Sequence, residues 1–67
     1  MTECELIGYS NADDFLMLYL KDSSGKELQK KIQVTNYNLR VGDKMTLGSN
    51  VVIWKRPGRE VTLTCVN

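Results

Sequence analysis

The sequence contains no histidine, which removes the side chain that enzymes use most often as a general base. It has only two cysteines, Cys4 and Cys65, and without histidine they are too few for a zinc site. Neither cysteine has a basic neighbour in the sequence, and the five glycines are scattered instead of forming a phosphate-binding loop. We therefore expect no catalytic residues, no cofactor, no metal and no small-molecule substrate. The protein is predicted not to be an enzyme.

Long apolar runs are also missing from the chain. No apolar segment approaches the roughly 20 residues that a membrane-spanning helix needs, and the acidic segment 1–5 does not resemble a signal peptide. These features predict a cytoplasmic protein with no membrane contact. In that reducing compartment Cys4 and Cys65 are expected to be thiols buried as small apolar residues. A single disulfide between them is the alternative if the first and last strands are neighbours.

Charge is nearly balanced, at +1, but it is unevenly distributed. The first 14 residues hold four acids and no base, whereas the rest hold all nine bases and four acids, so an acidic side and a basic side are expected. Alternation places Glu3, Glu5, Ile7 and Tyr9 on one face of a first strand, which charge would keep soluble. The Asp13-Asp14 pair is interpreted as a solvated turn and not as an acid pair or metal site.

Alternation and turn residues predict an all-β fold in a single domain, residues 1–67, with 42% apolar residues. Five to six short antiparallel strands are expected in a small barrel or sandwich, at residues 3–9, 15–21, 26–35, 44–47, 51–54 and 60–66. The connection 36–43 holds at most one short helical turn, with Leu39 and Val41 in the core. A meander, a connection ending in Val41-Gly42-Asp43 and a hairpin together resemble SH3-like and OB-like barrels.

Three local features are predicted within this pattern. Segment 22–25, Asp-Ser-Ser-Gly, suits a type I turn followed by a glycine bulge. Pro57 is incompatible with the tight primed hairpin turns, so a wider loop is expected there. Lys30 falls on the apolar face of its strand. Either a bulge at Lys30-Lys31 turns it outward, or an inward lysine protects a sheet edge from pairing.

Segment 15–20 is the most informative stretch because both of its faces are apolar. Leu16, Leu18 and Leu20 share one face, and Phe15, Met17 and Tyr19 share the other. A chain of 67 residues has material for one core, so the second face either enters a strongly bent sheet or contacts a partner. The candidate partner-binding residues are Phe15, Met17, Tyr19 and Trp54.

These observations predict a non-enzymatic interaction module that binds a protein partner or self-associates as an oligomer. From its size alone, we expect a small regulator or accessory protein, such as the inhibitors and assembly parts carried by phages and mobile elements.

A basic hairpin supports the alternative function, single-stranded nucleic-acid binding by a small β-barrel. Such barrels combine a basic groove with aromatic side chains on which bases stack. The candidates are Trp54, Lys55, Arg56, Arg59, Arg40 and Lys44, with Phe15, Tyr19 and Tyr37 as further stacking residues. The competing interpretation is a solvated hairpin tip that has Trp54 in the core. The weak net charge and the acidic first segment count against nucleic acid.

Overall fold

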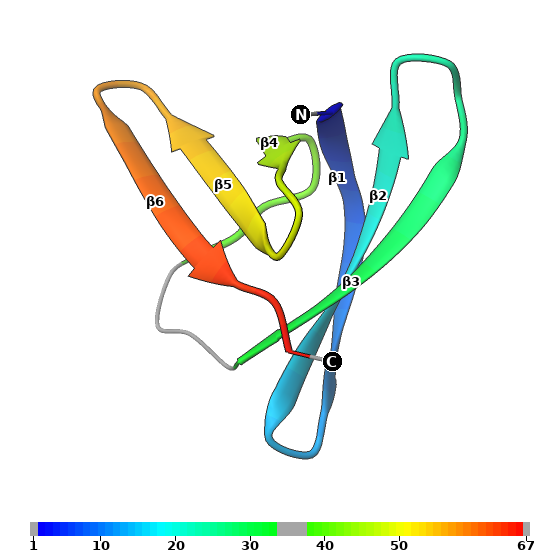
Figure 1. Cartoon of the computed structure of the whole chain (residues 1–67), viewed down its shortest axis with the longest axis vertical. Helices are drawn as coiled ribbons and strands as arrows, with labels where there is room; N and C mark the ends of the chain where they lie inside the picture. The colour runs from blue at the N-terminus through cyan, green and yellow to red at the C-terminus, as the bar shows by residue number, and fades with distance from the viewer. Residues whose placement is uncertain (1, 34–37, 67) are drawn as a thin grey trace.

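The computed structural model describes residues 2–33 and 38–66, which form a six-stranded antiparallel sheet without any helix (Figure 1). The all-β prediction is therefore confirmed. The strands lie in the spatial order β3-β2-β1-β4-β5-β6. Their bounds are β1 Thr2–Ala12, β2 Phe15–Asp22, β3 Glu27–Gln33, β4 Lys44–Leu47, β5 Val51–Arg56 and β6 Arg59–Thr64. Residues 34 and 35, expected to end the third strand, and Tyr37 lie outside the described residues.

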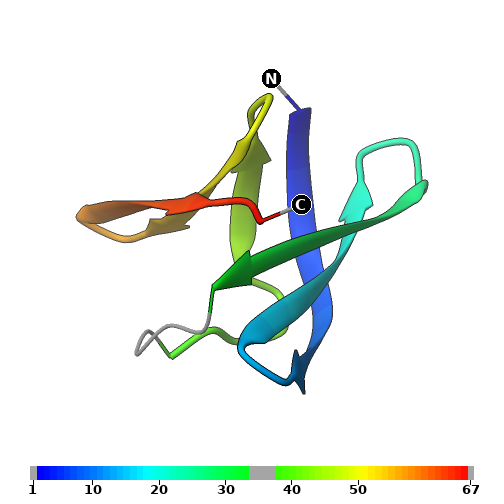
Figure 2. The same ribbon diagram turned by 60° about the horizontal axis from the view of Figure 1, so that its bottom comes forward.

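The long strand β1 joins the two halves of the sheet, because it pairs with β2 on one side and with β4 on the other. The sheet bends strongly, so the C-terminal end of the chain reaches the edge strand β3 (Figure 2). There Ile32 and Cys65 form an isolated bridge, and Val66 donates its N–H to the Lys31 carbonyl at 2.7 Å. Within the described residues β3 and β6 are joined only here. The sheet is consequently not closed into a barrel, contrary to that alternative of the prediction.

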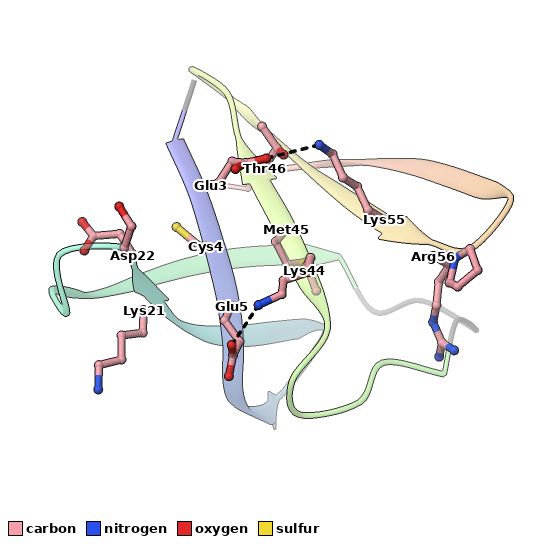
Figure 3. Close-up of a pocket in the computed structure, with 12 residues that line it drawn as sticks. Glu3, Cys4, Glu5, Lys21, Asp22, Lys44, Met45, Thr46, Lys55 and Arg56 are labelled. Carbon is pink, nitrogen blue, oxygen red and sulfur yellow. Dashed lines mark hydrogen bonds and ion pairs between the residues drawn. The ribbon is translucent and has the colours of Figure 1, made fainter.

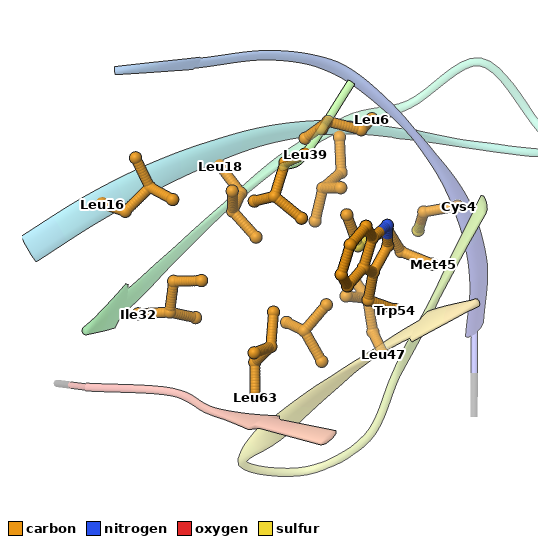
Figure 4. Packing of buried hydrophobic residues seen from close by; sticks show 12 residues of the cluster. Cys4, Leu6, Leu16, Leu18, Ile32, Leu39, Met45, Leu47, Trp54 and Leu63 are labelled. Atoms are coloured by element: carbon orange, nitrogen blue, oxygen red, sulfur yellow. The ribbon is translucent and has the colours of Figure 1, made fainter. Parts of the chain in front are cut away.

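The core fills the inner face of the bent sheet, where side chains from both halves meet (Figure 4). Leu16, Leu18 and Leu20 of β2 are buried there, as alternation predicts. Leu39 from the loop before β4 also enters the core, as expected. The complete cluster is Cys4, Leu6, Leu16, Leu18, Leu20, Ile32, Leu39, Met45, Leu47, Val52, Trp54 and Leu63.

Val41 was expected in the core but is 65% exposed. The reason is a turn in which Asp43 donates its N–H to the Arg40 carbonyl at 3.0 Å, leaving Val41 and Gly42 at the tip. Gly42 has a φ of 99°, a conformation that glycine adopts readily. The described part of this connection, residues 38–43, contains this turn and no helix.

A bulge in β1 changes which of its residues face outward. The β1–β2 register shifts between Leu6 and Gly8, so Ile7 is the extra residue. Beyond the bulge Gly8 lies opposite Tyr19, whereas Tyr9 lies opposite the inward-facing Leu18 and is 48% exposed. The prediction that Tyr9 shares a face with Glu3 and Glu5 is therefore wrong, because the bulge reverses the alternation.

The turn between β2 and β3 has the predicted form. Gly25, with a φ of 88°, donates its N–H to the Asp22 carbonyl at 3.0 Å. The Asp22 carboxylate oxygen Oδ1 accepts hydrogen bonds from the Ser24 hydroxyl at 2.7 Å and from the Lys26 N–H at 2.9 Å. These bonds, the hydroxyl first, lower the pKa of Asp22 because they stabilise its charged form.

The turn between β5 and β6 is tighter than predicted. Arg56 pairs directly with Arg59, so only Pro57 and Gly58 connect the strands. Gly58 has a φ of 73°. Proline followed by a glycine of positive φ is the pattern of a type II turn. The prediction of a wide loop was wrong because Pro57 excludes the primed turns but suits this one.

Lys30 lies on the inner face of the edge strand β3 and is half-buried. The β2–β3 register runs without a shift from Phe15 opposite Gln33 to Lys21 opposite Glu27, so no bulge turns Lys30 outward. The inward-lysine alternative therefore describes the structure.

Both cysteines are free, and no disulfide joins them because β1 and β6 are not neighbours in the sheet. Cys4 is buried as predicted, and burial raises the pKa of its thiol. Cys65 is half-buried and packs against the core.

Candidate interaction surface

Around the middle of β2, the outer face of the β3-β2-β1 half of the sheet has few charges. Phe15, Met17 and Tyr19 run along its centre on β2, and the β2 register sets residues of β1 and β3 beside them. We call this surface the charge-poor face and define it by Phe15, Met17, Tyr19, Gly8, Ser10, Gln29, Lys31 and Gln33. Lys31 is its one charged residue. Aromatic residues and methionine with few charges are the composition of interface centres.

The three central side chains of the charge-poor face are half-buried. The Lys31 ammonium lies 4.3 Å from the centre of the Phe15 ring, close enough for a cation–π interaction. The Tyr19 hydroxyl and the Ser10 Oγ are 3.3 Å apart and share a hydrogen bond. Gly8 has no side chain and lies beside the Tyr19 ring, where an added Cβ would come within 3.8 Å of it. These neighbours hold the central side chains in place while part of each remains accessible.

A recess of about 280 Å³ adjoins Met17 where the charge-poor face meets the edge of β3. Gln29, Lys30 and Lys31 line it from β3, and Ser49, Asn50, Cys65 and Val66 line it from the other half of the chain. A recess beside an apolar strip can receive one anchoring side chain of a partner. It exists because the sheet bends until the C-terminal segment touches β3.

Trp54 lies apart from the other three predicted partner-binding residues. It is on the inner face of β5, only 4% exposed, opposite Met45 of β4. Its indole Nε1–H donates a hydrogen bond to the Asp43 Oδ2 at 2.9 Å. The structure therefore brings Phe15, Met17 and Tyr19 together on the outer face and places Trp54 in the core, as the solvated-hairpin interpretation anticipated.

Asp43 organises the loop around Trp54. Besides the indole, its Oδ2 accepts the Arg40 backbone N–H at 2.9 Å and lies 3.9 Å from the Arg56 Nε. The Arg56 guanidinium lies 4.9 Å from the Trp54 ring centre and donates to the Asn38 carbonyl at 2.7 Å. These contacts hold the loop against β5, so Trp54 and Arg56 act in this structure as parts of the fold.

The other predicted nucleic-acid-binding residues do not lie together on one surface. Lys44 forms an ion pair with Glu5 at 3.1 Å, and Lys55 forms one with Glu3 at 3.6 Å (Figure 3). Arg40 and Arg59 are exposed elsewhere. The acidic and basic segments are therefore interleaved on one surface instead of forming separate sides.

Glu5, Lys44 and Lys55 also belong to a charged row that crosses all six strands. Directly opposed residues follow one another along it in the order Glu27, Lys21, Glu5, Lys44, Lys55 and Glu60. Most neighbours in the row have opposite charge, which stabilises cross-strand pairing. An open groove of about 840 Å³ runs beside the row. Thr46, 6% exposed, lines this groove, and its hydroxyl has no hydrogen-bond partner among the described residues.

Two features of the site escaped the sequence interpretation. The bulge at Ile7, which sets Gly8 and Ser10 on the charge-poor face, had one signal, the isolated glycine within a strand. The role of Asp43 had no comparable signal, because its partner Trp54 is on a different strand.

Comparison with protein-family models, curated proteins and solved structures finds no match for this chain. Nothing in residues 2–33 and 38–66 is a helix long and apolar enough to cross a membrane. The same residues contain no group of three or more histidine, cysteine, aspartate or glutamate side chains that could hold a metal ion.

Proposed function

We propose that this chain is a non-enzymatic interaction module that binds a protein through the charge-poor face. The observation that carries the proposal is the contrast on β2. Its inner leucines complete the core, yet Phe15, Met17 and Tyr19 form a second apolar strip that the fold only half covers. Such a strip with few charges favours contact with another apolar surface. The occupant is another protein or a second copy of the chain.

The surroundings of the strip support this proposal. Gln29 and Gln33 offer amide groups at its border, and the recess beside Met17 can take an anchoring side chain. Polar groups around an apolar centre are the usual arrangement of a protein interface. We further propose that the bent sheet is an open variant of the SH3-like or OB-like architecture. The two free thiols suit action in the cytoplasm as a small regulator.

The test replaces Met17, at the centre of the strip, with aspartate. Proteins retained from a lysate of the source cell by immobilised wild type are compared with those retained by Met17→Asp, and light scattering gives the mass of each purified protein. We expect Met17→Asp to lose a specific partner or to lose self-association, because the new carboxylate would be desolvated in the contact. Circular dichroism checks that the variant is folded.

Val41→Asp is the matched control, since it introduces the same charge at an exposed apolar residue outside the face. It should retain whatever the wild type retains. The proposal is rejected if a folded Met17→Asp protein keeps the same partners and the same mass as the other two. A wild type that is wholly monomeric removes the self-association version alone.

Nucleic-acid binding receives less support from the geometry, because burial of Trp54 withdraws the central stacking residue. Titration with oligonucleotides at low salt, followed by Trp54 fluorescence, tests it directly. Binding through phosphates would weaken steeply as salt is added.

A further inference from the structure

The two edges of the sheet differ in how they are protected against pairing with another strand. On β3, the half-buried Lys30 lies on the inner face, where an incoming strand would have to place apolar residues. Inward charges of this kind discourage edge-to-edge association. The β3 edge is also partly occupied, because the Lys31 carbonyl accepts the Val66 N–H.

The β6 edge has neither form of protection at its centre, around Val61. β6 is the outermost strand on its side of the sheet (Figure 1). Its inner face carries Val61 and Leu63, and the charged residue of that face, Arg59, stands at the start of the strand beside the turn. On the side away from β5, the described residues supply a pairing partner only just after β6, where Cys65 bridges to Ile32.

The hydrogen-bonding groups of this edge can be assigned from the neighbouring pairs. Cys65 donates its N–H to the Asn50 carbonyl at 2.9 Å, so the backbone N–H of Cys65 points toward the side of β5. Alternate residues of an antiparallel strand point the same way. Val61 and Leu63 therefore also bond to β5, whereas the backbone groups of Glu60 and Thr62 point outward from the sheet. No residue in 2–33 or 38–66 pairs with the backbone of Glu60 or Thr62 on that side.

From this geometry we propose that a second copy of the chain pairs with β6 through the same edge, in antiparallel orientation about a twofold axis. The pairing is self-complementary in a register centred on Val61. Glu60 then lies opposite Thr62 of the second copy, and the two Val61 side chains meet on the inner face. The outward backbone groups of Glu60 and Thr62 exchange hydrogen bonds with their counterparts, and no like charges are opposed.

This dimer differs from contact through the charge-poor face, and it leaves that face free for another protein. A twofold pairing of identical edges closes after two copies. Pairing of β6 with β3 of the next copy would instead continue into long assemblies, and the inward Lys30 disfavours it. A dimer of limited area is expected to dissociate on dilution.

The decisive variant is Thr62→Pro, compared with Thr62→Ala. The Thr62 N–H points away from β5, so proline removes an edge donor without breaking the β5–β6 ladder. Sedimentation velocity over a wide range of concentration measures the mass. We expect wild type and Thr62→Ala to dimerise as concentration rises and Thr62→Pro to stay monomeric. Met17→Asp should keep the dimer, which separates this proposal from self-association through the charge-poor face.

Amide hydrogen exchange of the wild type provides a second test that does not depend on how a variant folds. Exchange at Glu60 and Thr62 should slow as the concentration rises, whereas the outward amide of Gln29 on β3 should keep its rate. The proposal is overturned by a wild type that remains monomeric, by a folded Thr62→Pro protein that still dimerises, or by exchange rates independent of concentration. Growth into polydisperse assemblies would overturn the twofold version.

Discussion

The strands β2 and β5 have the same kind of sequence and yet occupy different surroundings. Both are apolar on two faces, and both send their inner residues, such as Leu18 and Val52, into the core. On the outer face they differ. Met17 of β2 is bordered by Ser10 and Lys31, whereas Ile53 of β5 lies between Thr46 and Thr62.

The difference teaches that a two-faced apolar strand is not by itself an interface. On β5 the outer apolar residues are Val51 and Ile53, and threonines of the neighbouring strands lie opposite them. On β2 three large side chains follow one another, and the bulge in β1 sets Gly8 and Ser10 beside them. The neighbouring strands therefore decide which of the two carries a long apolar strip on its outer face.

The largest effect on stability is expected from substitutions that compare the two faces of β2. Leu18→Ala removes a fully buried side chain and should lower the free energy of unfolding by about 2–5 kcal/mol, a large share for so small a domain. Met17→Ala, one residue away on the half-buried outer face, should cost about 1 kcal/mol or less. Urea unfolding of both variants measures this. Equal losses would mean that the outer strip also belongs to the core.

A smaller effect is expected at the polar cluster that distinguishes β5. Asp43→Ala removes the acceptor of the hydrogen bond from the Trp54 indole and the carboxylate that lies beside Arg56. Such a loss costs about 1–3 kcal/mol. Asp43→Asn keeps an oxygen for the indole and should fall between Asp43→Ala and wild type. Thermal unfolding followed by Trp54 fluorescence measures the series, and exposed Asp14→Ala is the control. A cost no greater than that of Asp14→Ala would show that Asp43 does not hold Trp54.

The smallest effect concerns the turn that ends β2. Because the pKa of Asp22 is lowered in the folded state, its charged form stabilises the fold at pH values above the ordinary aspartate range. This contribution is lost as the pH falls through the lowered pKa. We expect wild-type stability to decline in acid and Asp22→Asn, which keeps an acceptor but cannot titrate, to decline less. Identical acid profiles of wild type and Asp22→Asn would contradict the assignment.

Much of the fold could be predicted because it depends on local alternation. Leu16, Leu18 and Leu20 point inward because side chains alternate along a strand, and Asp22 to Gly25 form their turn from their own side chains. The tight Pro57-Gly58 turn was not predicted, because Pro57 excludes the primed turns, whereas the turn that forms depends on the positive φ of Gly58. The barrel alternative failed because closure depends on how two distant edges meet.

The candidate site was predicted in part for the same reason. Phe15, Met17 and Tyr19 share a face by alternation alone, so their grouping could be read from β2. The position of Trp54 away from these three residues could not be read from the sequence. Its burial depends on contacts with Asp43 and Arg56, which form only when the loop folds against β5. The interleaving of Glu3 and Glu5 with Lys55 and Lys44 likewise depends on β1 lying beside β4.

By itself, the sequence determined the all-β class, the inward leucines, the hairpin turn after β2 and the strip on its outer face. These features follow from alternation and turn chemistry over a few residues. Only the tertiary structure decided the strand order, the open sheet, the position of Trp54 and, among the described residues, the different protection of the β3 and β6 edges. Those features depend on residues far apart in the chain, whose neighbours are set by the packing of one shared core.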